Sequence, residues 1–316
     1  MILDAHVHVC AMSSEHGKTS SRVLDSLAFR YIRWRMHIAG SDAKAEAELA
    51  QFLAGQISQS GLDAAVVLAF DAVYTPDGEL DDRDTHFYVK NDYVIELAAK
   101  FPNTRFGASV HPYRRDAVAE LERCVKAGAV LLKWLPITQN MDPSDARCFP
   151  FYEALAHHRL PLLCHTGGEK SLPTLNAGYA DPMLLKPALD RGVTVIAAHC
   201  GTRSFSGESD FVPQFMQMAQ DYEHLYGDTA ALNLPTRSYA WPTVLNNSVV
   251  RSKLIHGSDW PIPVFAPLAV TGITGLRFYR ESNWLARDIK IKRSLGLEED
   301  YWQRAAKILR QNGKPS

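Results

Sequence analysis

The chain has 316 residues, enough for one large α/β barrel or two ordinary domains. Hydrophobic residues make up 46% of the chain and charged residues 22%, and 34 basic against 35 acidic residues give a formal net charge of -1. This is an ordinary globular composition. The balanced charge excludes a strongly basic chain, and nothing in it suggests a nucleic-acid or anionic-membrane partner, so we expect a small-molecule substrate as the partner.

The cysteines and the apolar runs narrow the class further. No apolar run reaches the roughly 18 residues that a membrane span needs, and no basic-then-apolar leader precedes Asp4. The cysteines are odd in number and form no CxxC pair, which indicates free thiols in a reducing compartment. They are Cys10, Cys124, Cys148, Cys164 and Cys200. We therefore expect a cytoplasmic protein, and the sequence leaves open whether it forms a homo-oligomer.

Eight short apolar runs of strand length recur along the chain, separated by segments with helical periodicity. The runs are Ile2–Val9, Ala64–Phe70, Arg105–Val110, Ala129–Trp134, Pro161–His165, Val193–His199, Leu225–Ala230 and Leu254–Gly257. Among the helical segments, Asp116–Lys126 has apolar residues at three- and four-residue spacing and stops at Gly128. Another helix is predicted to begin at Asp181-Pro182 and to end before Gly192.

Alternating strands and helices favour a parallel sheet with crossover helices. Eight such repeats match the strand count of a (β/α)8 TIM barrel, whereas a doubly wound open sheet more often carries a glycine-rich phosphate loop after its first strand. No GxGxxG follows Val9. We therefore predict one α/β barrel domain over residues 1–316.

The segment between the first two runs is longer than a single crossover helix needs. We predict a helical insertion after strand one, at about residues 12–60, on the carboxyl-terminal face of the barrel. It would serve either as a lid over the site or as a subunit contact. The insertion carries Arg30, Arg33 and Arg35 together with Trp34.

Polar residues end nearly all of the apolar runs. They are His6, His8, His111, Lys133, His165, His199, Asp228, His256 and Asp259. Burying such groups is costly unless they are paired or bind a metal, and the carboxyl ends of barrel strands meet at one mouth. His6 and His8 are two residues apart, so a strand would turn both imidazoles to one face. Histidine and carboxylate ligands around an open position are typical of a catalytic zinc site.

Four motifs resemble the amidohydrolase superfamily, specifically its amidohydrolase-related branch of metal-dependent hydrolases and non-oxidative aromatic-acid decarboxylases. They are "DAHVH" in strand one, "CHTG" after strand five, "AAHCG" after strand six and "HGSDWP" after strand eight, in that order over residues 4 to 261. The resemblance implies a (β/α)8 barrel with a divalent metal at its mouth. It further implies that His6, His8 and His165 are metal ligands and that Asp259 is both a ligand and the general base.

The resemblance leaves the number of metal ions open. In one-metal members the strand-six histidine, here His199, acts beside the nucleophilic water, and in two-metal members it binds the second ion. Lys133 stands where a carboxylated lysine bridges two metals in binuclear members, but a charge-paired lysine that is no ligand also occurs there. We expect one or two divalent ions per chain, with Zn²⁺ favoured.

A few further residues near the strand ends suggest a small acidic or cyclic substrate. Arginine binds carboxylates with two parallel hydrogen bonds, and aromatic rings form walls for ring-shaped molecules. The candidate substrate residues are Arg203, Arg237, Glu169 and Trp134.

These patterns predict a metal-dependent hydrolase that activates water to cleave an amide, ester or lactone bond. Asp259 would take the proton from water and His199 would stabilise the oxyanion. The alternative is a non-oxidative decarboxylase of an aromatic or related acid that uses the same metal site. A hydrolase without metal and a non-catalytic binding protein are both disfavoured by the complete set of ligands.

Overall fold

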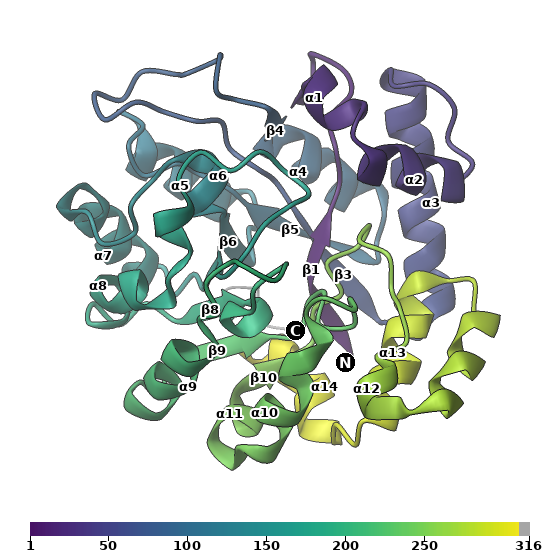
Figure 1. Ribbon diagram of the computed structural model, residues 1–316. Helices are drawn as coiled ribbons and strands as arrows, with labels where there is room; N and C mark the ends of the chain where they lie inside the picture. The colour runs from purple at the N-terminus through teal and green to yellow at the C-terminus, as the bar shows by residue number, and fades with distance from the viewer. Residues whose placement is uncertain (310–316) are drawn as a thin grey trace.

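The computed structural model describes residues 1–309. Its centre is an eight-stranded sheet in which every neighbouring pair is parallel, in the order β1-β3-β5-β6-β7-β8-β9-β10. The strands are β1 Leu3–His8, β3 Ala64–Leu68, β5 Thr104–Ala108, β6 Leu131–Trp134, β7 Leu162–His165, β8 Val195–Ala198, β9 Leu225–Asp228 and β10 Leu254–Ile255. Each lies within or overlaps one of the eight predicted runs, and Figure 1 shows them at the centre of a ring of helices. The predicted TIM-barrel fold is confirmed.

Backbone hydrogen bonds between β1 and the segment after β10 close the sheet into a barrel. The Ala5 amide donates to the His256 carbonyl at 3.0 Å, the Asp259 amide to the His6 carbonyl at 2.9 Å, and the His8 amide to the Trp260 carbonyl at 2.7 Å. The first and last strands therefore meet at the two motifs that carry the candidate ligands.

The helices lie between successive strands and outside the sheet (Figure 1). Their bounds are α1 Ser21–Leu24, α2 Leu27–Arg35, α3 Ala43–Ser60, α4 Asn91–Lys100, α5 Ala117–Lys126, α6 Pro136–Gln139, α7 Phe149–His157, α8 Lys186–Leu189, α9 Val212–Asp221, α10 Trp241–Asn246, α11 Ser248–Lys253, α12 Leu268–Thr271, α13 Trp284–Ser294 and α14 Glu299–Leu309. Short 3-10 helices are η1 Ala146–Cys148, η2 Ala177–Ala180, η3 Pro182–Leu185, η4 His199–Gly201, η5 Ser238–Ala240 and η6 Ile273–Arg280. Within the described residues, no helix has the length and apolar character needed to cross a membrane.

Local sequence explains where these helices begin. α5 follows Asp116 and buries Leu121 and Cys124, as the spacing of its apolar residues predicts. The helix expected at Asp181 starts as the 3-10 segment η3, whose first turn is capped by the Asp181 carboxylate accepting from the Met183 amide at 2.8 Å, and continues as α8. Capping by a carboxylate satisfies amides that the first turn leaves without an intrahelical partner.

Small and branched side chains fill the barrel interior, and α14 joins them. Leu3 and Ala5 of β1 form one buried cluster with residues of β3, β6, β7 and β8, and the cluster includes Ala305 and Leu309 of α14. α14 therefore packs against the interior of the barrel at the end opposite the mouth, so the barrel is a packed core and not a pore.

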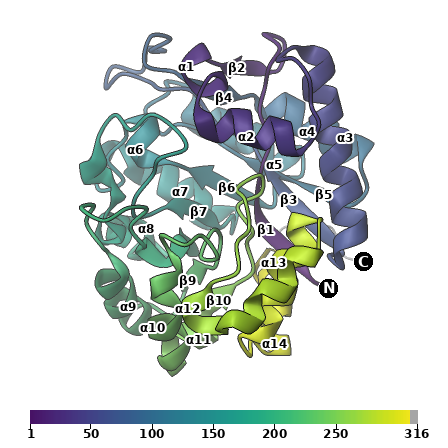
Figure 2. The ribbon, with the colours of Figure 1, turned by 45° about the vertical axis from the view of Figure 1, so that its right-hand side comes forward.

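The chain between β1 and β3 contains α1, α2, α3 and a short strand, β2 Gly17–Thr19. β2 pairs antiparallel with β4 Phe87–Val89, a two-stranded sheet that the sequence analysis did not predict because three-residue strands carry too little periodicity. α3 packs against α13 in the outer ring, the position of a crossover helix. Figure 2 shows α1, α2 and the β2–β4 pair together at one end of the molecule.

Candidate metal centre at the mouth of the barrel

His6, His8 and Asp259 come together at the mouth of the barrel. Each offers one ligand atom, and these atoms all lie within 4.8 Å of one another. The register of β1 against β3 shifts between Asp4 and Val7, a β-bulge type of irregularity that re-aims side chains. Ala5 therefore still belongs to the interior cluster, while the Nε2 atoms of His6 and His8 approach to 3.0 Å.

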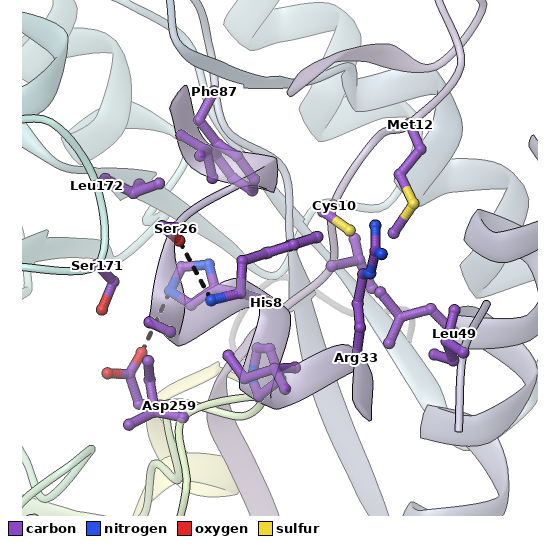
Figure 3. A pocket seen from close by; sticks show the side chains of 18 of the residues that line it. His8, Cys10, Met12, Ser26, Arg33, Leu49, Phe87, Ser171, Leu172 and Asp259 are labelled. Carbon is purple, nitrogen blue, oxygen red and sulfur yellow. Dashed lines mark hydrogen bonds and ion pairs between the residues drawn. The ribbon is translucent and has the colours of Figure 1, made fainter. Parts of the chain in front are cut away.

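The spacing of these three atoms fits a bound ion. Asp259 Oδ1 is 3.4 Å from His6 Nε2 and 3.4 Å from His8 Nε2. Two ligand atoms on a tetrahedral zinc ion at about 2.0–2.1 Å would be about 3.3 Å apart. Both imidazoles and the carboxylate thus present donor atoms at the separations that one shared cation requires. Figure 3 shows the Asp259 carboxylate directed at the His8 ring.

Hydrogen bonds to the protein determine which nitrogen of His6 faces the site. Its Nδ1 donates to Asp228 Oδ2 at 2.7 Å, and burial, followed by the nearby charge of Lys133, keeps the pKa of His6 well below its ordinary value. His6 is therefore neutral at pH 7, and its Nε2 is the unprotonated nitrogen. A carboxylate that holds a metal-binding histidine in this way fixes the ring and raises its basicity.

His165 and His199 form a neighbouring pair outside that three-residue group. His199 Nδ1 donates to the Ala230 carbonyl at 2.9 Å, and His165 Nε2 donates to the Gly168 carbonyl at 3.2 Å. The remaining nitrogens, His199 Nε2 and His165 Nδ1, face each other at 3.2 Å. Burial lowers the pKa of both rings, so both of these nitrogens are unprotonated at pH 7. Because two lone pairs repel at this distance, a cation near them would be stabilised.

The His165–His199 pair adjoins the first group, since the rings of His6 and His199 are 5.3 Å apart between centroids. His199 offers an acceptor nitrogen and no N–H toward the site. It is therefore suited to bind a cation or receive a proton, and not to donate to an oxyanion.

Lys133, at the end of β6, reaches the same point from the opposite side of the barrel. Its Nζ lies 2.9 Å from His6 Nε2, and its side chain is buried. Burial lowers the pKa of Lys133, although the charges of Asp259 and Asp228 oppose that shift. Lys133 therefore contacts the candidate ligand set directly.

Asp259 is held as an anion in an unusual backbone conformation. Burial opposes its ionisation, but interactions with the His6 and His8 rings, together with the charge of Lys133, outweigh burial and lower its pKa. Its φ of 66° lies in the left-handed region, as does that of His199 at 59°. Such conformations are uncommon for residues other than glycine and cluster at functional sites.

A cavity of about 890 Å³, including its opening to solvent, adjoins His8 and Asp259. Phe29 and Ile32 of α2 line it together with Leu135, and Figure 3 shows further apolar side chains around it. α2 therefore forms part of the cavity wall beside His8 and Asp259, with Arg33 among the lining residues, and the role of the insertion as a lid stays a prediction. His165, Arg30 and Trp34 are not among the residues that line it.

Glu169 is the one predicted substrate residue that lines this cavity. One of its carboxylate oxygens accepts from the Ser171 and Leu172 amides, and the other lies 3.9 Å from His165 Nδ1. Glu169 thus connects the loop after β7 to the His165–His199 pair.

The other predicted substrate residues lie away from the cavity. Arg237 is buried and donates to the Thr202 carbonyl at 2.7 Å and to the Gly168 carbonyl at 2.6 Å, so it clamps the loops after β7 and β8 together. Arg203 stacks over the Tyr239 ring at 4.4 Å. Trp134 is fully buried, and its indole N–H donates to the Val110 carbonyl at 2.8 Å.

His111 and His256 also stay outside the ligand group. His256 Nδ1 is 3.3 Å from the Tyr301 hydroxyl and its Nε2 is 3.9 Å from Asp4 Oδ2, so its ring faces groups outside the ligand set. The residues that the sequence analysis missed are those of the cavity wall. Met12 and Phe87 carry no signal in the sequence, because only the folded loops bring them beside His8.

Comparison with known families and structures agrees with this architecture. The amidohydrolase family model matches residues 3–275 of the chain. No curated protein matches the sequence. An uncharacterised TIM-barrel protein from Bordetella bronchiseptica superposes with a TM-score of 0.66 at 18% identity, covering 99% of each chain.

Two similar structures carry functional names. One is a putative 2-pyrone-4,6-dicarboxylic acid hydrolase from Pseudomonas putida, with a TM-score of 0.58 at 16% identity, covering 99% of this chain and 98% of that one. The other is a 2,6-dihydroxybenzoate decarboxylase from Rhizobium, with a TM-score of 0.58 at 13% identity, covering 99% of each chain. At these identities the likeness establishes the fold alone. The family match over nearly the whole length shows that the chain belongs to the amidohydrolase family.

Proposed function

We propose that the protein is a metal-dependent hydrolase that cleaves an amide, ester or lactone bond in a small acidic or cyclic substrate. The observation that carries the proposal is the convergence of two imidazoles and one ionised carboxylate at the barrel mouth, with ligand atoms that all lie within 4.8 Å of one another. His6, His8 and Asp259 would hold the ion, with His165 adjoining them, and Zn²⁺ suits this mixture of imidazole and carboxylate donors.

When bound, a divalent ion would polarise the scissile carbonyl and lower the pKa of a water molecule. The chain's own groups move the proton. Asp259 is ionised and borders the cavity, so its free oxygen is placed to take a proton from water and to return it to the leaving group. His199 presents a second acceptor nitrogen. The apolar cavity wall excludes other water from the substrate, which strengthens these electrostatic interactions.

Non-oxidative decarboxylation of an aromatic acid by the same groups is the second candidate. The apolar cavity beside Asp259 favours it, because a ring would fit there and water is not a reactant. The similar Rhizobium structure is named a decarboxylase. In this reaction a proton from water would pass through Asp259 to the ring carbon that loses carbon dioxide, and the remaining hydroxide would combine with the carbon dioxide as bicarbonate.

Metal analysis of purified protein tests the site. Asp259→Asn and His8→Gln should each lower the metal bound per chain and remove activity. Asp228→Asn leaves the ligands in place but frees the His6 ring, so it should lower metal affinity or activity by roughly 10–100-fold. His157→Gln, at an exposed position at the end of α7, is the matched control and should change neither. Full metal content in both ligand variants would contradict the proposed site.

Products distinguish the two reactions. The metal-loaded protein should be offered a panel of lactones, esters and amides, and separately a panel of hydroxybenzoic acids. Incorporation of ¹⁸O from labelled water into the product identifies hydrolysis. Release of carbon dioxide without ¹⁸O in the organic product identifies decarboxylation.

A further inference from the structure

α2 carries three arginines that end in three different environments. Arg30 is exposed on the outer face of the helix, and Arg35 lies over the Trp284 ring at 6.0 Å. Only Arg33 lines the cavity that adjoins the candidate metal centre. In Figure 3 its side chain lies beside Cys10 and Met12, and His8 lies between Arg33 and Asp259.

The Arg33 guanidinium lacks a protein partner. Its Nε is buried without a hydrogen bond, and the side chain makes no ion pair with any residue in the range 1–309. The charges of Glu46 and Arg33 both act on the pKa of Cys10, but Glu46 already accepts the Met12 amide at 2.6 Å, the Ser13 amide at 3.1 Å and the His16 ring. An unsatisfied buried donor of this kind costs about 1–3 kcal/mol, and more when it is charged. An acceptor supplied by a ligand would remove that cost.

Charges around the cavity direct an anion toward Arg33. The carboxylates of Asp259 and Glu169 lie at the metal end of the cavity, where a bound divalent ion would offset them. Among the lining residues Arg33 is the one arginine or lysine, so a ligand carboxylate outside the metal centre would pair with it. Figure 3 shows Ser171 and Leu172, which follow Glu169 in its loop, on the side away from Arg33. The wall between the two ends is mostly apolar, so a ligand that spans the cavity needs an apolar middle.

We infer that Arg33 binds a carboxylate of the substrate, at the end opposite the reacting carbon, and so selects acids with an apolar or ring-shaped body. A guanidinium and a carboxylate match in two parallel hydrogen bonds, which gives orientation as well as affinity. The assignment of the reacting end rests on the proposed function, whereas the carboxylate contact rests on Arg33 and the cavity. Under the decarboxylation alternative, this carboxylate is a second one that is retained in the product.

Calorimetric binding of simple ligands tests the inference without turnover. The probes are benzoate, phenylacetate and 3-phenylpropanoate, each paired with its neutral amide, in protein as purified and after chelator treatment. Wild type should bind at least one carboxylate in preference to its amide, with or without metal. Arg33→Met should lower the affinity for that carboxylate by about 10- to 100-fold and change the affinity for the amide by no more than a few fold. Arg33→Lys should recover part of the loss.

Arg30→Met is the control on the same helix and should bind like wild type. Thermal unfolding of each variant shows whether α2 is still packed. Equal carboxylate binding by Arg33→Met and wild type, an equal loss in Arg30→Met, or no preference for carboxylates in wild type would overturn the inference. The readout is ligand binding and not turnover. An active hydrolase could therefore lack carboxylate binding at Arg33, and a protein without hydrolase activity could still show it. The two proposals can thus be contradicted independently.

Discussion

The buried histidines near the strand ends differ in what their two ring nitrogens contact. His6 and His199 each give one nitrogen to a protein acceptor and turn the other to the site. In His111 both nitrogens are used, because Nε2 donates to the Gln139 carbonyl at 2.9 Å and Nδ1 accepts from the Tyr113 amide at 3.1 Å. His111 therefore has a structural position, although the sequence places it at a strand end like the others.

The protonation of His111 makes stability depend on pH. Burial lowers its pKa to about 3, whereas the unfolded chain has the ordinary value of 6.5. Between these values the unfolded state binds one more proton, so stability is lost as the pH falls below 6.5. This group alone should lower the free energy of unfolding by about 2 kcal/mol between pH 7 and pH 5. Urea unfolding of wild type and His111→Gln at both pH values should show a smaller decrease in the variant.

The other buried histidines are present in both wild type and His111→Gln, so their contributions to the pH dependence cancel in the comparison. Parallel losses of stability in wild type and His111→Gln would contradict the assignment. A lower stability of the variant at pH 7 would not, because glutamine replaces only part of the hydrogen bonding.

At the scale of elements, α3 holds the loop after β1 in place. Glu46, on the buried face of α3, accepts the Met12 and Ser13 amides and contacts the His16 ring, which stacks on Tyr93 with 4.2 Å between centroids. Met12 in turn lines the cavity. The helix in the outer ring thus positions part of the cavity wall through a single buried carboxylate.

Glu46→Ala should destabilise the protein by about 1–3 kcal/mol, because it leaves two backbone amides without their acceptor. Chemical denaturation measures this loss. Glu48→Ala, at an exposed position on the same helix, should stay within about 0.5 kcal/mol of wild type. If the two variants were equally stable, the loop would have to be held by other contacts.

At the scale of the whole molecule, the closure of the barrel depends on polar contacts beneath the metal centre. Asp4 Oδ1 accepts the His6 amide and the Ser258 amide, both at 3.0 Å, which ties β1 to the segment after β10. Lys292 of α13 is fully buried and donates to the Gly257 carbonyl at 2.7 Å while it pairs with Asp288. The segment that carries Asp259 is therefore fixed from two sides.

Lys292→Met should destabilise the fold by about 3–5 kcal/mol, because it leaves the buried Asp288 carboxylate without its cation. Adding Asp288→Leu should restore part of that loss, although Asn233 then loses its acceptor. Lys290 is two residues from Lys292 on the same helix and forms an exposed ion pair with Glu281. Lys290→Met should therefore lower the free energy of unfolding by at most about 1 kcal/mol. Denaturant unfolding of the three proteins gives the comparison, and equal stability of the two lysine variants would disprove the role of Lys292.

The eight strands could be predicted because each is a local run of apolar residues bounded by polar ones. β2 and β4 could not be predicted, because a strand of three residues is too short to show an alternation of apolar and polar residues. The candidate site was predictable in part. His6 and His8 share a face by simple alternation. The register shift after Asp4, however, has no signature in the sequence, and it allows Ala5 as well as both imidazoles to face the interior of the barrel.

The sequence by itself determined the succession of strands and helices, the positions of the polar strand ends and the family, because these depend on residues that are close along the chain. Tertiary structure alone decided which polar groups meet. Barrel closure brings Asp259 to His6 and His8 across some 250 residues of chain,. Arg237 donates its hydrogen bonds to loop carbonyls, whereas the buried Nε of Arg33 has no partner. This difference depends on residues that are distant in the sequence, so no local pattern predicts it.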